Sequence, residues 1–181
     1  MGQAVSPTPC HHRTSPMALE IERRFFVVSD AWQALSVRHE QLDQGYLSQG
    51  KEGVIVRVRR SEEQAWLTLK APTNNPEIRH EFEYTIPEAD AAALLSLTPR
   101  RVTKTRHHLN YPGGDWVVDV FSGDNAPLVI AEVERENPEA ALAIPEWCGE
   151  EITGRGELSN AALAVHPWNQ LEAYSRGNRF S

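Results

Sequence analysis

The sequence predicts an α+β fold built on eight antiparallel β-strands, a number typical of a barrel or a sandwich. Eight segments alternate polar residues with β-branched, aromatic or other apolar residues, which is the period of a strand with two different faces. Gly, Pro, Asn and Asp gather between these segments, and such residues end strands and form turns. Short separators make most consecutive strands antiparallel neighbours. A few helical patterns among the strands complete the prediction.

The first predicted strand shows the pattern clearly. Leu19, Ile21 and Phe25 share one face, and the residues between them are mostly charged. The eight predicted strands cover residues 19–28, 41–48, 53–60, 64–70, 78–86, 101–111, 115–122 and 128–136.

One helix is predicted with more support than the others, at residues 87–97. Pro87 suits a first helical turn, and Ala and Leu follow it. Shorter helical patterns cover residues 137–143 and 158–166, and a terminal helix is predicted at 169–177.

The length of 181 residues indicates one domain with a sizeable core. With 40% hydrophobic and 24% charged residues, the composition is that of a globular protein. Residues 1–16 are rich in Pro, Ser and Thr without periodicity. We therefore expect a disordered tail at 1–16 and a single domain at 17–181.

The composition also excludes several kinds of partner. A formal charge of −7 argues against non-specific binding to nucleic acid, which needs a basic field. No apolar run approaches the length that crosses a bilayer, and the N-terminus lacks the apolar block of a signal peptide. We expect a cytoplasmic protein that does not bind membranes, with Cys10 and Cys148 as reduced thiols. Strand edges and the terminal helix could support a homodimer, which is left open.

Every predicted strand except the second has a charged face. For one strand, a solvated face is the simpler interpretation. Taken together, the charges are mostly Glu and Arg, with carboxylates two residues apart on three strands; such neighbours repel unless a cation lies between them. The charged sets are Glu20, Glu22 and Arg24; Arg57 and Arg59; Lys70; Arg79, Glu81 and Glu83; Lys104, Arg106 and His108; Asp119; and Glu132, Glu134 and Glu136.

These faces could line the interior of a closed sheet if the apolar faces pack outside it. Buried charges need partners. Carboxylates would bind hard divalent cations through oxygen, and Arg and Lys would bind an anion rich in oxygen. A polyphosphate chelated by Mg²⁺ or Mn²⁺ satisfies both requirements.

An ordered succession of short motifs carries a family resemblance. The segments EIERRF, QGYL, VRVR, TLK, HEFEY, KTRH, VVDVF, AEVERE, GEEITG and LSNAALA follow one another in this order. From Leu19 to about Trp168 the chain resembles the CYTH family, also called triphosphate tunnel metalloenzymes. The resemblance implies an eight-stranded antiparallel β-barrel that forms a tunnel with charged walls, flanked by helices. It also implies a divalent metal and the cleavage or cyclisation of triphosphate-containing substrates.

The resemblance assigns roles to matching residues. It implies that the signature pair Glu20 and Glu22 holds a metal, and that Arg24 and Lys70 act with this pair in catalysis. The implied substrate-binding residues are Arg57, Arg59, Lys70, Lys104 and Arg106. The implied metal ligands are Glu20, Glu22, Asp119, Glu132 and Glu134, and Glu81 and Glu83 would complete an acidic floor.

Two positions depart from the family pattern. The signature normally ends in Lys, and Arg24 stands there; Arg keeps the charge but forks over a larger area and cannot readily act as a base. Family members often carry a basic residue shortly before the SN of the last motif, and Arg155 is the nearest here. Tyr46 could orient a water molecule or simply pack, and His108 could contact phosphate or lie exposed at the rim.

The leading hypothesis is metal-dependent hydrolysis of the terminal phosphate of inorganic triphosphate or a small organic triphosphate, with Mg²⁺ or Mn²⁺ as cofactor. One alternative is a class IV type adenylate cyclase, which would expel pyrophosphate from ATP. Another is a catalytically inactive polyphosphate-binding module, suggested by Arg24. Hydrolysis of thiamine triphosphate would need an aromatic clamp that the sequence does not reveal.

Overall fold

The strands of the computed structural model, which describes residues 19–49, 53–139 and 141–171, form one antiparallel sheet. Their bounds are β1 Leu19–Val27, β2 Ser36–Gln49, β3 Ile55–Arg60, β4 Ala65–Pro72, β5 Ile78–Ile86, β6 Arg101–Leu109, β7 Asp115–Phe121, β8 Val129–Glu134 and β9 Cys148–Glu151. They lie in the order β5-β4-β3-β2-β6-β7-β8-β1-β9.

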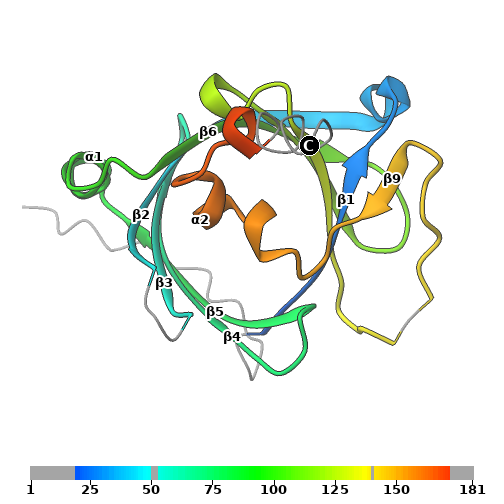
Figure 1. The fold of residues 1–181 in the computed structure, drawn as a ribbon, viewed down its shortest axis with the longest axis horizontal. Coiled ribbons are helices and arrows are strands. Elements are labelled where there is room, and N and C mark those ends of the chain that lie inside the picture. Colours follow the sequence, from blue (N-terminus) through cyan, green and yellow to red (C-terminus); the bar gives the residue numbers. More distant parts are fainter. Residues whose placement is uncertain (1–18, 50–52, 140, 172–181) are drawn as a thin grey trace, which may run out of the picture.

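A second pairing of β1 closes the sheet. Glu20 of β1 lies opposite Arg79 of β5, so the first eight strands form the ring seen in Figure 1. The predicted α+β fold with an eight-stranded antiparallel barrel is confirmed. β9 extends the sheet from the other end of β1, with Phe25 opposite Glu151.

One helix covers the outer face of the barrel. α1 (Glu88–Ser96) follows Pro87, and acidic side chains in its first turn suit the positive end of the helix dipole. Its buried Ala91 and Leu95 pack on Val58 and Ala65 of the sheet. Because these apolar side chains point outward, the residues that alternate with them point into the barrel.

A second apolar cluster lies inside the ring and forms a floor. The short helices η3 (Gly156–Leu158) and α2 (Asn160–Leu163) enter the barrel, as Figure 1 shows for α2. Leu158 and Leu163 are buried there with Tyr46, Phe121 and Ile130 of the strands. We call this cluster the apolar floor, because it closes one end of the barrel.

Several predicted elements differ from those observed. The predicted helix at 137–143 is wrong for the described residues, because the side chain of Asn137 accepts a hydrogen bond from the backbone N–H of Glu139 and holds a turn. β2 begins at Ser36 rather than at residue 41, directly after the unpredicted 3₁₀ helix η1 (Asp30–Leu35). The pattern at 158–166 forms only η3 and the single turn of α2. β9 was also not predicted.

Some predictions fall on residues outside the described ranges. The predicted tail at 1–16, with Cys10, lies there, and so does the end of the terminal helix after residue 171; residues 168–171 are helical. None of the described helices has the length and apolar composition needed to cross a bilayer.

Candidate functional site

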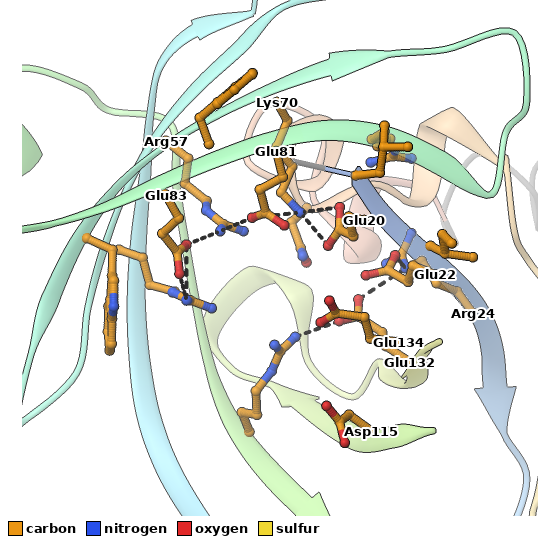
Figure 2. Close-up of a pocket in the computed structure, with 18 of the residues that line it drawn as sticks. Glu20, Glu22, Arg24, Arg57, Lys70, Glu81, Glu83, Asp115, Glu132 and Glu134 are labelled. Carbon is orange, nitrogen blue, oxygen red and sulfur yellow. Dashed lines mark hydrogen bonds and ion pairs between the residues drawn. The ribbon is translucent and has the colours of Figure 1, made fainter. Parts of the chain in front are cut away.

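The charged faces of the strands line one cavity of about 1750 Å³ inside the barrel. Figure 2 shows labelled side chains from β1, β4, β5 and β8 pointing toward one another across it. The predicted site residues that line it are Glu20, Glu22, Arg24, Arg57, Arg59, Lys70, Arg106, Glu132 and Glu134, and Glu81 and Glu83 line it as well. Of the predicted set, Lys104 and Asp119 are not on its surface.

One wall of the cavity is acidic. Glu22 of β1 lies opposite Glu134 of β8, and Glu132 is the next residue of β8 that faces inward. Burial, together with the carboxylates of Glu132 and Glu20, raises the pKa of Glu22 to about 8. The Glu22 carboxyl therefore resists ionisation unless a further cation lies beside it.

Arg24 crosses this acidic wall. Its Nε lies 3.1 Å from a carboxylate oxygen of Glu132 and 3.5 Å from one of Glu22. Its Nη2 donates a hydrogen bond of 3.1 Å to the backbone carbonyl of Leu158 in the apolar floor. One guanidinium thus binds β1, β8 and η3, which a lysine ammonium could not do with the same geometry.

The opposite wall is basic. Arg57 donates to Thr68 at 3.1 Å and to Glu83 at 3.2 Å, and Arg59 donates to Glu83 at 3.0 Å. The Nε atoms of Arg57 and Arg59 are buried and have no hydrogen-bond partner among the described residues. Burial and the charge of Arg57 lower the pKa of Arg59 to about 10. Two adjacent guanidiniums with unused donors suit an anion with several oxygens.

Lys70 links the two walls. Its Nζ lies 2.7 Å from both carboxylate oxygens of Glu20 and 3.4 Å from Glu81 (Figure 2). Burial alone would raise the pKa of Glu20, but the charge and hydrogen bonds of Lys70, together with the charge of Arg57, outweigh burial and lower the pKa.

Beneath the cavity surface, Lys104 and Asp119 form a buried ion pair, and the two side chains are 1% and 0% exposed. Asp119 also accepts two hydrogen bonds from Arg106, of 2.8 and 2.7 Å. Arg106 reaches the cavity, where its Nη2 lies 2.5 Å from Glu132. In this arrangement Asp119 and Lys104 hold Arg106 from below, and their predicted roles as metal ligand and phosphate ligand stay predictions.

Several residues of the cavity were missed in the sequence. The prediction that the second strand has no charged face is wrong, because β2 begins at Ser36 and directs Arg38 and Glu40 into the cavity. The alternation of residues 36–40 was the available signal. Trp66 also lines the cavity, with the Arg59 guanidinium 4.7 Å from its ring centre.

The structure also locates three residues whose roles the sequence left undecided. Tyr46 is 2% exposed in the apolar floor, and burial raises its pKa to about 12. Arg155 is exposed, away from the cavity, and pairs with Glu150 and Glu157. His108 lines the cavity.

The donor set of the acidic wall fits a hard divalent cation, which carboxylate oxygens prefer. The raised pKa of Glu22 supports this fit, because a cation would stabilise its ionised form. As the side chains lie, no three His, Cys, Asp or Glu residues within the described ranges converge closely enough to hold an ion. Lys70, Arg24 and Arg106 contact the same carboxylates instead.

Comparison with known proteins identifies the family of this chain. The model of the CYTH domain family matches residues 18–162. An inorganic triphosphatase of Acetivibrio thermocellus is 34% identical over 158 residues, which cover 86% of this chain and 99% of that protein. An inorganic triphosphatase of Nitrosomonas europaea is 35% identical over 150 residues, 81% of this chain and 97% of that protein.

The fold of this chain is also similar to that of a solved structure. The crystal structure of an inorganic triphosphatase, 34% identical in sequence, superposes with a TM-score of 0.59 and covers 81% of this chain and 94% of its own. Because the family model matches most of the chain, and the barrel closes around a charged interior, this protein belongs to the CYTH domain family.

Proposed function

We propose that the protein is a metal-dependent triphosphatase that hydrolyses the terminal phosphate of inorganic triphosphate or of a small organic triphosphate. The observation that carries the proposal is one cavity in which an acidic wall faces a basic wall. Two relatives that align over most of their length are inorganic triphosphatases. We propose that the same activity extends to this chain.

In this proposal the basic wall binds the phosphate chain. Arg57, Arg59, Lys70 and Arg106 all line the cavity, and their charged groups would neutralise phosphate oxygens. Lys104 would reach the substrate only if its ion pair with Asp119 separated. Catalysis of phosphoryl transfer depends mainly on positioning and on charge, so a rigid barrel wall is a suitable support.

The acidic wall would hold the metal. Glu20, Glu22, Glu132 and Glu134 offer carboxylate oxygens, and Asp119 stays a further predicted ligand. The family implies a divalent metal, and we propose Mg²⁺ or Mn²⁺, because both accept carboxylate and phosphate oxygens. When bound, such an ion supplies Lewis acidity toward phosphate oxygens and toward water. Glu20 and Glu22 orient these oxygens, Lys70 neutralises the phosphate beside Glu20, and Arg24 keeps Glu22 and Glu132 in place.

The proposal is tested with a phosphate-release panel of tripolyphosphate, ATP, GTP and thiamine triphosphate, each with Mg²⁺ and Mn²⁺. The double variant Glu20→Gln/Glu22→Gln should lose at least about 10²-fold in kcat, because both substitutions remove charge at the proposed metal site. The matched control is Glu62→Gln/Glu146→Gln, which removes two exposed carboxylates that do not line the cavity. Wild-type turnover by the Glu20/Glu22 variant would refute the site.

Trp66 is the observation that favours an organic triphosphate as a second candidate substrate. Its indole lies in the cavity wall beside Arg59, where an aromatic group attached to the phosphate chain could stack on it. Trp66→Leu should then raise KM for ATP or thiamine triphosphate and leave KM for tripolyphosphate within about twofold. Chromatography of the ATP reaction with Mn²⁺ distinguishes hydrolysis from cyclisation, since only a cyclase yields cyclic AMP.

A further inference from the structure

A cluster of three charged or titratable residues lies in the cavity but outside the set that the family resemblance implies. Arg38 and Glu40 come from the start of β2, and His108 comes from the end of β6, where it pairs in register with Arg38. All three line the cavity. We call Arg38, Glu40 and His108 the rim cluster, because the Arg38 side chain is 60% exposed at the open end of the cavity.

The hydrogen bonds of the rim cluster cannot all form at once. Nε2 of His108 lies 3.0 Å from Nη2 of Arg38 and 2.8 Å from a carboxylate oxygen of Glu40. That nitrogen must accept a hydrogen bond from Arg38 but donate one to Glu40, and one tautomer cannot do both. If His108 donates to Glu40, Nη2 of Arg38 loses His108 as its acceptor. A phosphate oxygen would supply that acceptor.

Arg38 is also paired less closely with carboxylate than Lys70 and Arg106, which line the same cavity. Its nearest contact, with Glu40, is 3.5 Å. The corresponding contacts are 2.7 Å for Lys70 and 2.5 Å for Arg106. A charge-assisted hydrogen bond is strongest below about 3 Å. Arg38 therefore keeps much of its capacity to bind an added anion.

The fold decides in which direction a longer substrate could extend. The apolar floor closes one end of the barrel with side chains that are at most 3% exposed at Tyr46, Phe121, Ile130 and Leu158. A phosphate chain that lies between the acidic and basic walls can lengthen only away from this floor. Arg38 lies in that direction, two residues beyond Glu40, which pairs with Arg106, and two residues of a strand span about 6.6 Å.

We propose that Arg38, with His108, forms a subsite for an additional phosphoryl group, so that the cavity accepts linear polyphosphates longer than triphosphate. This inference rests on the proposed function and adds to it the class of substrate. Glu40 binds His108 in the occupied state and leaves Arg38 to the phosphate. A neutral group attached to the triphosphate would offer Arg38 no such contact.

The test compares tripolyphosphate with linear tetrapolyphosphate. In Arg38→Gln, the ratio of KM for tetrapolyphosphate to KM for tripolyphosphate should rise about fivefold over wild type, the size expected for a partly exposed ionic contact. Arg38→Lys should restore part of the ratio because it restores the charge. Arg100→Gln removes an exposed charge away from the cavity, and it should leave the ratio unchanged.

Each other outcome has a defined meaning. An unchanged ratio in Arg38→Gln, or an equal loss for both substrates, overturns the subsite while hydrolysis stands. If Arg38→Gln instead raises the ratio of KM for ATP to KM for tripolyphosphate and leaves the tetrapolyphosphate ratio unchanged, the phosphate subsite is also overturned. Arg38 would then contact an organic group attached to the triphosphate. If wild type releases phosphate from neither substrate, the proposed function fails. Calorimetric titration of both polyphosphates without metal then still tests the subsite through the ratio of their Kd values.

Discussion

At Glu22 the requirements of binding and of folding oppose each other. The carboxyl is surrounded by Glu20, Glu132 and Glu134, an arrangement that suits a cation but raises its pKa to about 8 in the protein alone. Between the ordinary pKa of a glutamate and about 8, the Glu22 carboxyl therefore binds more protons in the folded protein than in the unfolded chain. The contribution of Glu22 to stability falls as the pH rises through this range.

Glu22→Gln should remove this pH dependence. In EDTA at pH 8.5 the variant should be more stable than wild type by on the order of 1 to 2 kcal/mol, which allows for the partial exposure of Glu22. At pH 4.5 the two proteins should unfold alike. Urea denaturation at both pH values measures the difference, with Glu62→Gln as the exposed control. A difference that is the same at both pH values would contradict the assignment.

Substitution of the two members of the buried ion pair, Asp119 and Lys104, should destabilise the fold to different extents. Asp119 serves both Lys104 and Arg106, so Asp119→Asn leaves two cations without their carboxylate and should destabilise the fold by about 3 to 5 kcal/mol. Lys104→Met leaves Asp119 paired with Arg106 and should cost about 1 kcal/mol or less. Urea denaturation checks the order. A larger loss of stability for Lys104→Met than for Asp119→Asn would show that Asp119 is not the shared partner on which the two cations depend.

At the scale of elements, β2 shows how one strand serves both faces of the barrel. Its inward residues include Arg38, Glu40 and Tyr46, whereas Gly45 lies on the outer face under α1. A β-carbon at Gly45 would lie 2.8 Å from Cδ2 of Leu95 and 3.0 Å from Cγ2 of Thr98. The glycine of the QGYL motif therefore lets the segment around α1 lie directly on the strand.

Gly45→Ala should destabilise the protein by about 1 to 3 kcal/mol, because Leu95 and Thr98 are buried and cannot move freely. Gly156→Ala is the matched control, since nothing lies within 4 Å of its added β-carbon; its effect should be within about 0.5 kcal/mol. Thermal unfolding of both variants measures the contrast. Equal effects of the two substitutions would mean that the close approach of Leu95 and Thr98 to Gly45 does not decide the cost.

At the scale of the whole molecule, the barrel brings opposite charges from distant parts of the sequence to one cavity. Lys70 binds Glu20, 50 residues away, and Arg106 binds Glu132, 26 residues away. A ligand that contacts both walls would connect β1 and β8 with β3 and β4. Binding should therefore stabilise the entire fold.

Tripolyphosphate with Mg²⁺ or Mn²⁺, at about 100 times its Kd, should stabilise the protein by about 3 kcal/mol and raise Tm by about 5 to 10 °C. Differential scanning fluorimetry measures the shift, with Glu20→Gln/Glu22→Gln used to slow turnover and weaken metal binding. That variant should show a smaller shift than wild type. Equal shifts with sulfate at the same ionic strength would indicate a non-specific anion effect.

The sequence by itself determined the number of barrel strands, α1 and the charged inward face of most strands, because alternation of side chains is a local property of the chain. Only the tertiary structure decided which charges meet. It placed Asp119 and Lys104 below the cavity and brought Arg38 next to His108, 70 residues away. It also placed Trp66 in the cavity wall. These contacts depend on strand register and on barrel closure, which join residues that no local pattern relates.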